Sequence, residues 1–433
     1  MARFEPQSTD IGRERAILVG VDHGGVGDWT VEESLGELRR LAETGGAQVV
    51  QVVTQRLDRP VPKTYIGSGK VVEIAALVDS LEADVVIFDD ELTPSQQSNL
   101  EHALGEPTKV IDRTALILDI FGMHARTRAG RLQVQLAQLQ YVLPRLRGMW
   151  SHLVGEQTRG GIGSRFGQGE SQLEVDRRLV RRRIATLREE LRRLERQRDV
   201  QSKARWESGI YRVALVGYTN AGKSTLLNRL TGSDVYVQDE LFATLDPTTR
   251  SLDLEEGRKV TITDTVGFIQ KLPTTLIEAF KSTLSEVLAA DLILKVVDAS
   301  DQQAHKELAA VDGVLGEIGA SEIRSVVVYN KCDLIDEEAR RALAVSHPDA
   351  VQISALEGQG IKGLLYRVAQ EASLGDETMT VLVPYERGAL ISMVHERCQI
   401  IREEYVQGGL MATLRASRRI GDYLAPYVVR DEP

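Results

Sequence analysis

A run of residues with the types and spacing needed to bind phosphate begins at Gly217. The stretch 211–232 reads YRVALVGYTNAGKSTLLNRLTG and contains the pattern G-x-x-x-x-G-K-S, which ends at Ser224. Backbone amides of such a loop wrap phosphate groups, a lysine neutralises their charge, and a hydroxyl ligates Mg²⁺. We therefore expect Lys223 to contact the outer phosphates of a nucleotide and Ser224 to hold magnesium. The apolar run before the loop and the helix-like run after it supply the context that this pattern requires.

Three further motifs follow in the order that a guanine-nucleotide site needs. The run KVTITDTVGF predicts a strand that leads into Asp264 and Gly267, whose carboxylate would hold magnesium through a water and whose amide would sense the terminal phosphate. In NKCD, Asp333 can accept hydrogen bonds from N1–H and N2–H of guanine, a pair that adenine does not offer. The stem of Lys331 would lie over the purine, and the backbone at Ala355 would meet the guanine O6. The sequence therefore predicts a site for GTP and GDP.

The segment DELFATLDPTTR, residues 239–250, lies where the third phosphate must be sensed. A threonine there should complete the magnesium shell when GTP is bound and lose that contact after hydrolysis. Thr244, Thr248 and Thr249 are the candidates, and the pattern by itself does not choose among them.

Two positions bear on hydrolysis. Phe268 stands where Ras-like domains carry a glutamine that orients the attacking water; because a phenyl ring cannot do this, we expect slow intrinsic hydrolysis and an activating group supplied by a partner. Asn220 occupies the loop position of the potassium-binding asparagine in TrmE-like GTPases, so K⁺ is a candidate source of positive charge in the transition state. The alternative is that Asn220 stabilises its own loop. Hydrolysis rates in potassium and sodium buffers distinguish the two.

The composition indicates which cellular compartment the protein occupies. The 433 residues are 42% hydrophobic and 27% charged, as in ordinary water-soluble proteins with real cores. Cys332 and Cys398 are too few for a disulfide framework, which favours a reducing cytosol. The first residues lack the apolar core of a signal peptide, and no run approaches the ~18 apolar residues of a membrane span. We expect a cytoplasmic monomer.

A basic block interrupts an acidic chain. The net charge is −10, yet residues 125–205 contain 19 Lys and Arg against 8 Asp and Glu, a local excess of +11. Such a block favours a partner rich in phosphate. The alternative is a solvated coiled-coil surface.

The same block has the hydrophobic spacing of two helices. Leucines at 132, 136, 139 and 143 form a seam on a helix that Pro144 should end, and a second seam at 180, 184, 187, 191 and 194 lies on a helix from about 171 to 200. Consecutive seamed helices predict an antiparallel hairpin that projects. Its tip, PRLRGMWSHLVGEQTRGGIGSRFGQGE, interleaves arginines with aromatics that can stack on unpaired bases. The residues predicted to contact RNA are Arg145, Arg147, Trp150, Arg159, Arg165, Phe166, Arg177, Arg178, Arg181 and Arg182. A floppy connector is the other interpretation.

Alternating strand-like and helix-like runs predict one α/β domain near the amino terminus and another near the carboxyl terminus. Apolar runs at 16–21, 47–53 and 83–90 with a helix at 32–46 indicate a small parallel sheet. Lys70, in IGSGK at a helix start, is either a phosphate contact or part of a plain turn. We predict an α/β protein with four domains: an N-terminal α/β domain (1–122), a basic helical hairpin (123–208), a P-loop GTPase domain with a mostly parallel sheet and helices on both faces (209–375), and a small C-terminal α/β domain (376–433).

Across residues 15 to 425 the chain resembles the HflX family of ribosome-associated GTPases. The likeness rests on GYTNAGKSTLLNRL, LFATLDPTTR, DTVGFIQKLP, QLAQLQYVLPRLRGMW, QLEVDRR and, near the amino terminus, GSGKV and DELTPSQQ. It implies binding to the large (50S) ribosomal subunit, separation of stalled ribosomes under stress, and a hairpin tip that reaches towards ribosomal RNA at the peptidyl-transferase centre; it implies no DNA partner. The tip departs from the family's R-G-P-G-E, since RFGQGE stands at 165–170.

The family's F-A-T-L-D motif favours Thr244 as the magnesium ligand. The residues then predicted to bind the nucleotide are Gly217, Tyr218, Thr219, Asn220, Ala221, Gly222, Lys223, Ser224, Thr225, Phe242, Ala243, Thr244, Leu245, Asp246, Asp264, Thr265, Val266, Gly267, Asn330, Lys331, Asp333, Ser354, Ala355 and Leu356. Magnesium would be held by Ser224, Thr244 and, through water, Asp264. Catalysis would involve Lys223, Thr244, Gly267 and, with K⁺, Asn220.

Three functions fit these observations. The first is a switch whose GTP form binds the large subunit and whose hydrolysis releases it. The second is an RNA-remodelling enzyme with a second site, for ATP, in the N-terminal domain. The third is a signalling GTPase whose hairpin docks a protein.

Overall fold

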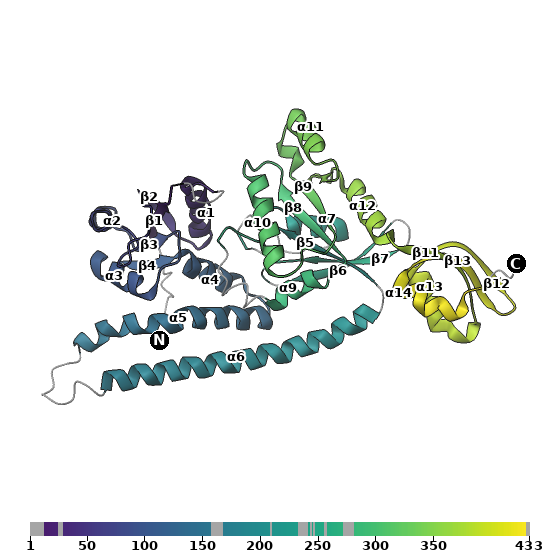
Figure 1. The fold of residues 1–433 in the computed structure, drawn as a ribbon, viewed down its shortest axis with the longest axis horizontal. Coiled ribbons are helices and arrows are strands. Elements are labelled where there is room, and N and C mark those ends of the chain that lie inside the picture. The colour runs from purple at the N-terminus through teal and green to yellow at the C-terminus, as the bar shows by residue number, and fades with distance from the viewer. Residues whose placement is uncertain are drawn as a thin grey trace, which may run out of the picture. The chain divides into compact units, whose positions relative to one another are not determined.

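The computed structural model describes residues 13–24, 29–156, 168–207, 210–232, 241–242, 245, 247–254, 258–271 and 281–429. The chain divides into two compact units (Figure 1). The first comprises Met1–Leu191 and Lys271–Ala279, and the second comprises Arg192–Gln270 and Phe280–Pro433. The α/β fold class predicted from the sequence is confirmed, and the boundaries of the four predicted domains stay a prediction.

The first unit is built on a parallel sheet with strand order β2-β1-β3-β4. Helices α1 and α4 pack on one face and α2 and α3 on the other, so every strand is covered. The bounds are β1 Arg15–Asp22, α1 Val31–Thr44, β2 Gln48–Arg56, α2 Ser68–Leu81, β3 Val85–Phe88, α3 Pro94–Leu104, β4 Lys109–Asp112 and α4 Arg113–His124. Capping boxes begin α1 at Thr30 and α3 at Thr93, each closed by the side chain three residues later. The sequence prediction missed β4.

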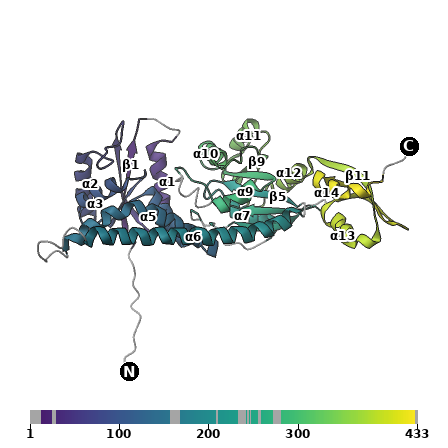
Figure 2. The ribbon, with the colours of Figure 1, turned by 60° about the horizontal axis from the view of Figure 1, so that its bottom comes forward.

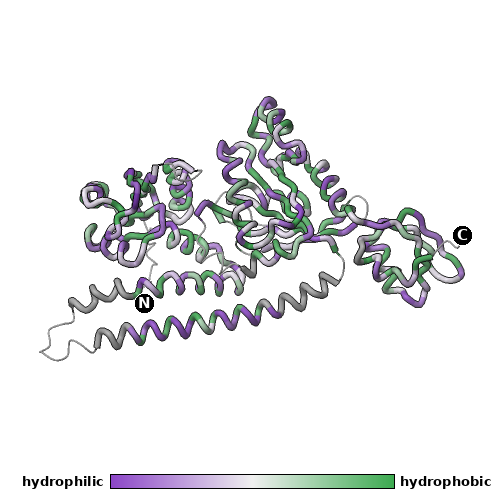
Figure 3. Tube along the Cα trace, in the orientation of Figure 1, coloured by the Kyte–Doolittle hydropathy of each residue, from purple (hydrophilic) through white to green (hydrophobic). Residues whose placement is uncertain are grey.

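Helices α5 (Arg128–Glu156) and α6 (Gln168–Glu207) lie side by side, as two views show (Figure 1, Figure 2). Most of the predicted seam forms: Leu136, Ile184, Leu187 and Leu191 are buried together, with Leu132, Leu139, Leu143 and Val180 packed around them. The hairpin does not project freely as predicted, because its helix α5 also packs against α3 and α4 of the first unit. Between its few hydrophobic positions α6 is mostly hydrophilic (Figure 3).

Pro144 lies inside α5 and does not end it, so that sequence prediction is wrong. Proline removes a backbone N–H and normally kinks or breaks a helix. Here both sides of the proline are bound to the N-terminal sheet: the Tyr141 hydroxyl donates to Asp112 Oδ1 at 2.9 Å, and Arg145 Nη2 is 3.2 Å from Asp112 Oδ2. These tertiary contacts offset the lost helical hydrogen bond.

The second unit contains a six-stranded sheet with order β10-β9-β8-β5-β7-β6, in which only β6 is antiparallel to its neighbour among the described strands. Its apolar strands share a buried core with α7 and α12, while α9 and α10 pack on the other face. The bounds are β5 Tyr211–Gly217, α7 Lys223–Thr231, β6 Thr248–Asp253, β7 Lys259–Asp264, α9 Lys281–Leu288, β8 Leu292–Asp298, α10 Ala304–Glu317, β9 Ser325–Asn330, η1 Cys332–Leu334, α11 Glu337–Ser346, β10 Val351–Gln352 and α12 Ile361–Ser373.

A smaller antiparallel sheet with order β11-β13-β12 follows in the same unit. Helices α13 and α14 cover one face of it, and Val381, Leu410 and Leu414 lie fully buried beneath them. The bounds are β11 Asp376–Val383, η2 Tyr385–Arg387, α13 Gly388–Arg397, β12 Gln399–Val406, β13 Gly409–Ser417, α14 Arg418–Leu424 and η3 Ala425–Tyr427. Across the described ranges, no helix is both long and apolar enough to cross a bilayer.

Candidate nucleotide-binding site

Four strand ends meet at one edge of the six-stranded sheet. Strands β9, β8, β5 and β7 are parallel neighbours, so their carboxyl ends lie together, at Asn330, Asp298, Gly217 and Asp264 respectively. In open parallel sheets ligands bind at this edge, where connections leave in opposite directions. Asp298 is the one member of the four that the sequence analysis does not include.

The loop between β5 and α7 requires glycine at its two ends. A Cβ at Gly217 would lie 2.2 Å from the backbone oxygen of Val296. Gly222 has a φ of +89°, and a Cβ there would lie 2.3 Å from Asn330 Nδ2. Asn220 between them is exposed with a φ of +60°, a conformation that asparagine tolerates better than most residues. These constraints produce the tight turn that a phosphate-binding loop needs.

Lys223 is a buried cation at the start of α7. Its side chain is 6% exposed, and Nζ donates to the backbone oxygens of Gly217 at 3.0 Å and Tyr218 at 2.7 Å. Burial lowers the pKa of Lys223 to about 8, against the opposing negative charges of Asp264 and Glu307. Phosphate oxygens in this loop would be stronger acceptors for the ammonium than these carbonyls.

Ser224 and Asp264 form the oxygen pair expected of a magnesium site. The Ser224 hydroxyl donates to Asp264 Oδ2 at 2.6 Å, and Asp264 is fully buried at the end of β7. Mg²⁺ prefers hard oxygen ligands and keeps several waters, so a hydroxyl beside a carboxylate fits this ion. Among the threonine candidates, Thr248 and Thr249 lie in β6, where Thr249 Oγ1 is 2.9 Å from Thr263 Oγ1. Thr244, like Ala243 and Asp246, lies outside the described residues.

The backbone after Asp264 is joined to the phosphate-binding loop. Phe268 N donates to Gly217 O at 3.1 Å, Thr219 N donates to Phe268 O at 2.8 Å, and the Phe268 side chain is 2% exposed. The ring is therefore part of the core. A Cβ at Gly267 would lie 2.9 Å from the Cα of Thr219 and 3.1 Å from Lys223 Nζ. This segment is thus in van der Waals contact with the residues expected to hold the phosphates.

Asn330 organises the predicted base site without facing solvent. It is 2% exposed; Nδ2 donates to Ala221 O at 2.9 Å, and Oδ1 accepts from Ala355 N at 2.9 Å. It therefore ties the phosphate loop to the Ser354–Ala355 loop. Lys331, with a φ of +60°, pairs with Asp298 at 2.7 Å between Nζ and Oδ2. Asp333 follows in η1 and is half-buried.

Three family models match consecutive parts of the chain. Residues 32–122 match "GTP-binding GTPase N-terminal", residues 124–205 match "GTP-binding GTPase Middle Region", and residues 212–331 match "50S ribosome-binding GTPase". The chain is 45% identical to GTPase HflX of Caldanaerobacter subterraneus subsp. tengcongensis over 96% of this chain and 94% of that protein. The chain belongs to the HflX family. GTPase HflX of Escherichia coli K12 is 42% identical over 90% of this chain and 91% of that one.

A solved GTP-binding protein from Sulfolobus solfataricus, in complex with GDP, is 25% identical and covers 83% of this chain and 99% of its own, with a TM-score of 0.42. The HflX family membership rests on the sequence relatives and the three matched models.

Some contacts at the HflX nucleotide site were not predicted from the sequence. The Tyr218 hydroxyl accepts from Gln270 N at 2.6 Å, which joins the phosphate loop to the chain beyond Gly267. Arg229 of α7 donates from Nε to Ala355 O at 2.8 Å. Asp298 could have been found from the sequence, because it ends an apolar run that forms a strand parallel to the others. The Tyr218 and Arg229 contacts could not be predicted from the sequence, since they depend on long-range packing.

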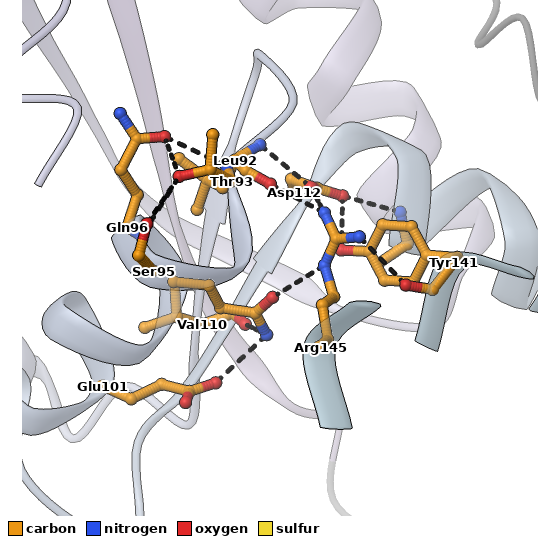
Figure 4. Close-up of polar contacts among 11 residues, drawn as sticks. Leu92, Thr93, Ser95, Gln96, Glu101, Val110, Asp112, Tyr141 and Arg145 are labelled. Carbon is orange, nitrogen blue, oxygen red and sulfur yellow. Dashed lines mark hydrogen bonds and ion pairs between the residues drawn. The ribbon is translucent and has the colours of Figure 1, made fainter. Parts of the chain in front are cut away.

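Arg145 does not belong to the RNA-contacting set (Figure 4). Its side chain is 9% exposed and lies in the first unit, where Nη2 is 2.7 Å from Leu92 O and 3.2 Å from Asp112 Oδ2, and Nε donates to Gln97 Oε1 at 3.1 Å. It also lies over the Tyr141 ring, 3.4 Å from the ring centroid. The basic-loop interpretation was wrong for this residue because a guanidinium can equally neutralise a buried carboxylate.

The other predicted RNA contacts are placed only in part. On α6, Arg178, Arg181 and Arg182 are exposed and Arg177 is half-buried. The residues of the predicted tip lie outside the described structure or have side chains that are not described; they are Arg147, Trp150, Arg159, Arg165 and Phe166. Those assignments stay predictions.

Replacement of Arg145 by alanine is expected to destabilise the first unit by about 2–4 kcal/mol, because it leaves the fully buried Asp112 carboxylate without its cation. Hydrogen exchange of β3 and β4 peptides in the full-length chain measures this unit alone. Arg128, whose side chain is 76% exposed beside Glu190, is the control; its replacement should cost under about 0.5 kcal/mol. Equal effects of the two substitutions would contradict a structural role for Arg145.

Proposed function

We propose that this chain is a GTP-hydrolysing switch that acts on ribosomes. In its GTP form it would bind the large ribosomal subunit, and hydrolysis would release it; separation of stalled ribosomes under stress is the activity we propose for the bound form. The observation that carries the proposal is the meeting of Gly217, Asp264 and Asn330 at one sheet edge, in a segment that matches a 50S ribosome-binding GTPase model. The proposed setting is the cytoplasm.

The roles within the site follow from the contacts above. Lys223 would exchange its two carbonyl partners for the outer phosphates, and Ser224 and Asp264 would hold magnesium, whose charge offsets that of the phosphates. Asp333 would select guanine, with Asn330 fixing the loops on either side of the base. Phe268 is buried and supplies no group to orient water, which supports activation by the ribosome. Thr244 and a K⁺ ion held by Asn220 remain parts of this proposal.

The alternative of a second nucleotide site in the first unit has less support. The Gly67 amide at the start of α2 donates to Gln55 Oε1 at 2.9 Å, and Lys70 Nζ pairs with Glu73 at 2.8 Å. The Gly67 amide and the Lys70 ammonium, two groups that would meet a phosphate there, already have protein partners. No comparable observation favours the signalling alternative.

Purified large subunits are expected to accelerate GTP hydrolysis, and the acceleration should weaken steeply as salt rises, because contacts with ribosomal RNA release counterions. Replacing both Arg181 and Arg182 by alanine should weaken subunit binding and lower the slope of log affinity against log salt by about two. The matched control is the pair Arg39 and Arg40, which are also adjacent and exposed on a helix. Hydrolysis that does not respond to large subunits would overturn the ribosomal proposal and favour a protein-docking hairpin.

A further inference from the structure

Asp298 holds the ammonium of Lys331 at the carboxyl edge of the six-stranded sheet. Lys331 Nζ lies 2.7 Å from Asp298 Oδ2, and the two side chains are 28% and 16% exposed, so water screens the pair only in part. Strands β8 and β9 are parallel neighbours, and Asp298 lies opposite Asn330, the residue before Lys331. The ion pair therefore joins the end of β8 to the segment that enters the predicted base site.

Asp298 is itself fixed by the turn that follows β8. Its Oδ1 accepts from Ser300 N at 2.9 Å and from Ser300 Oγ at 2.6 Å. The turn is tied to β9 as well, because Ala299 N donates to Asn330 O at 2.8 Å. One carboxylate oxygen thus sets the orientation of the side chain, and the other meets the lysine. A carboxylate that is already oriented loses little rotamer freedom when it pairs.

Lys331 is held at its backbone end too. Its φ of +60° is a left-handed conformation that lysine rarely adopts and that persists only where surrounding contacts hold it. The next residue, Cys332, donates from N to Ile353 O at 3.0 Å, and the side chain of the preceding Asn330 donates one hydrogen bond and accepts another. The methylene stem of Lys331 therefore runs between a fixed backbone and a fixed carboxylate. A ligand that lies on this stem does not have to order it.

Lys223 and Lys331 have acceptors of different strength. Lys223 at the phosphate loop donates to backbone carbonyls, which are weaker acceptors than phosphate oxygens. Lys331 has a carboxylate partner, so its charge is already compensated. The two lysines can then serve different parts of one ligand: Lys223 meets the phosphates, and Lys331 offers its apolar stem to the face of a base.

We propose that Asp298 is a positioning residue for guanine binding: its ion pair holds the stem of Lys331 against the face of the base whose edge Asp333 would select. The inference rests on the proposed binding of GTP and GDP and deepens it. A side chain that must be ordered on binding lowers the affinity, and a preorganised one does not. Because GTP and GDP carry the same base, loss of Asp298 weakens both equally. The hydrolysis step is spared, since Lys223 and Gly267, which would meet the terminal phosphate, are placed by other contacts.

Asp298→Asn keeps the shape of the side chain and an oxygen that can accept from Ser300, but it removes the charge that pairs with Lys331. Titration with fluorescent GDP and with a fluorescent non-hydrolysable GTP analogue is expected to show about a 10-fold loss of affinity for each, the size expected for ordering one loose lysine side chain. Single-turnover hydrolysis at saturating GTP should keep the wild-type rate. Asp312→Asn is the matched control, because it removes a lysine–carboxylate pair of the same length, 2.7 Å, with Lys295 of β8; its affinities should not change.

A double-mutant cycle separates positioning from general support of the fold. Lys331→Met keeps the stem and removes the ammonium, so it should lose about as much affinity as Asp298→Asn, and the double variant should lose no more than either one. Ser300→Ala, which releases one carboxylate oxygen, should give a smaller loss of about threefold. If Asp298→Asn fails to fold, Ser300→Ala decides the question in the same cycle.

Wild-type affinity in Asp298→Asn would overturn the inference. Losses that simply add in the double variant would overturn it too, because Asp298 would then act without Lys331. So would a hydrolysis rate that falls at saturating GTP, or a loss of affinity confined to GTP. If the wild-type chain binds no guanine nucleotide, the proposed function itself fails, and that result is distinct from each of the others.

Discussion

Replacing Lys223 by alanine is expected to weaken GTP binding by about 10²–10³-fold, roughly 3–4 kcal/mol. The ammonium is buried at the phosphate loop, where Nζ donates to the carbonyl oxygens of Gly217 and Tyr218. Phosphate oxygens bind a desolvated cation far more strongly than carbonyls do. Most of the favourable interaction energy of the Lys223 ammonium therefore comes from the bound nucleotide. Titration with a fluorescent guanine nucleotide measures the loss.

The fold should tolerate this change. Burial lowers the pKa of Lys223, which means that the folded chain without nucleotide disfavours the charge, and removing the charge costs the protein little. Lys295→Ala is the matched control: Lys295 lies on β8 of the same sheet, is largely buried, and pairs with Asp312 at 2.7 Å. Its replacement should leave nucleotide affinity unchanged. A loss of less than 10-fold in Lys223→Ala would refute the assigned role.

Gly267→Ala is expected to lower the rate of GTP hydrolysis by about 10²-fold, while the affinity for GDP changes by no more than about threefold. A Cβ at this position would lie 2.8 Å from Thr219 Cγ2 and 2.9 Å from Thr219 Cα. Because the Cα belongs to the backbone of the phosphate loop, neither side can move away cheaply. The Gly267 amide is then displaced from where it would meet the terminal phosphate, a group that GDP lacks.

Single-turnover hydrolysis and GDP titration together separate this effect from general damage. Gly363 of α12 is the control, since a Cβ there would meet nothing within 4 Å. Gly363→Ala should hydrolyse GTP at the wild-type rate. If Gly267→Ala lost GDP affinity as strongly as it lost hydrolysis, the segment would hold the loop together and would not sense the terminal phosphate.

The motifs of the nucleotide site were readable because each depends on local chemistry. The positive φ of Gly222 belongs to its own turn, and the strand–loop–helix pattern depends on residues adjacent in the sequence. The atoms that exclude a Cβ at Gly217 and Gly222, by contrast, belong to Val296 and Asn330 of other strands. The hairpin seam was predictable for the same reason, since leucines three and four apart share one face of a helix whatever the rest of the chain does. What these patterns predicted about the fold class and the family is confirmed.

The sequence by itself thus determined the phosphate loop, the order of the motifs behind it, and the seam of the hairpin. Only the tertiary structure decided which charges are buried and what they hold. Arg145 lies 33 residues from Asp112 and Lys271 lies 182 residues from Asp89, yet each pair is in contact. An arginine on a basic helix and a lysine after a turn have the same local pattern whether they face solvent or a buried carboxylate. The difference is set by long-range packing, which allowed α5 to continue through Pro144 and turned an expected RNA contact into part of a core.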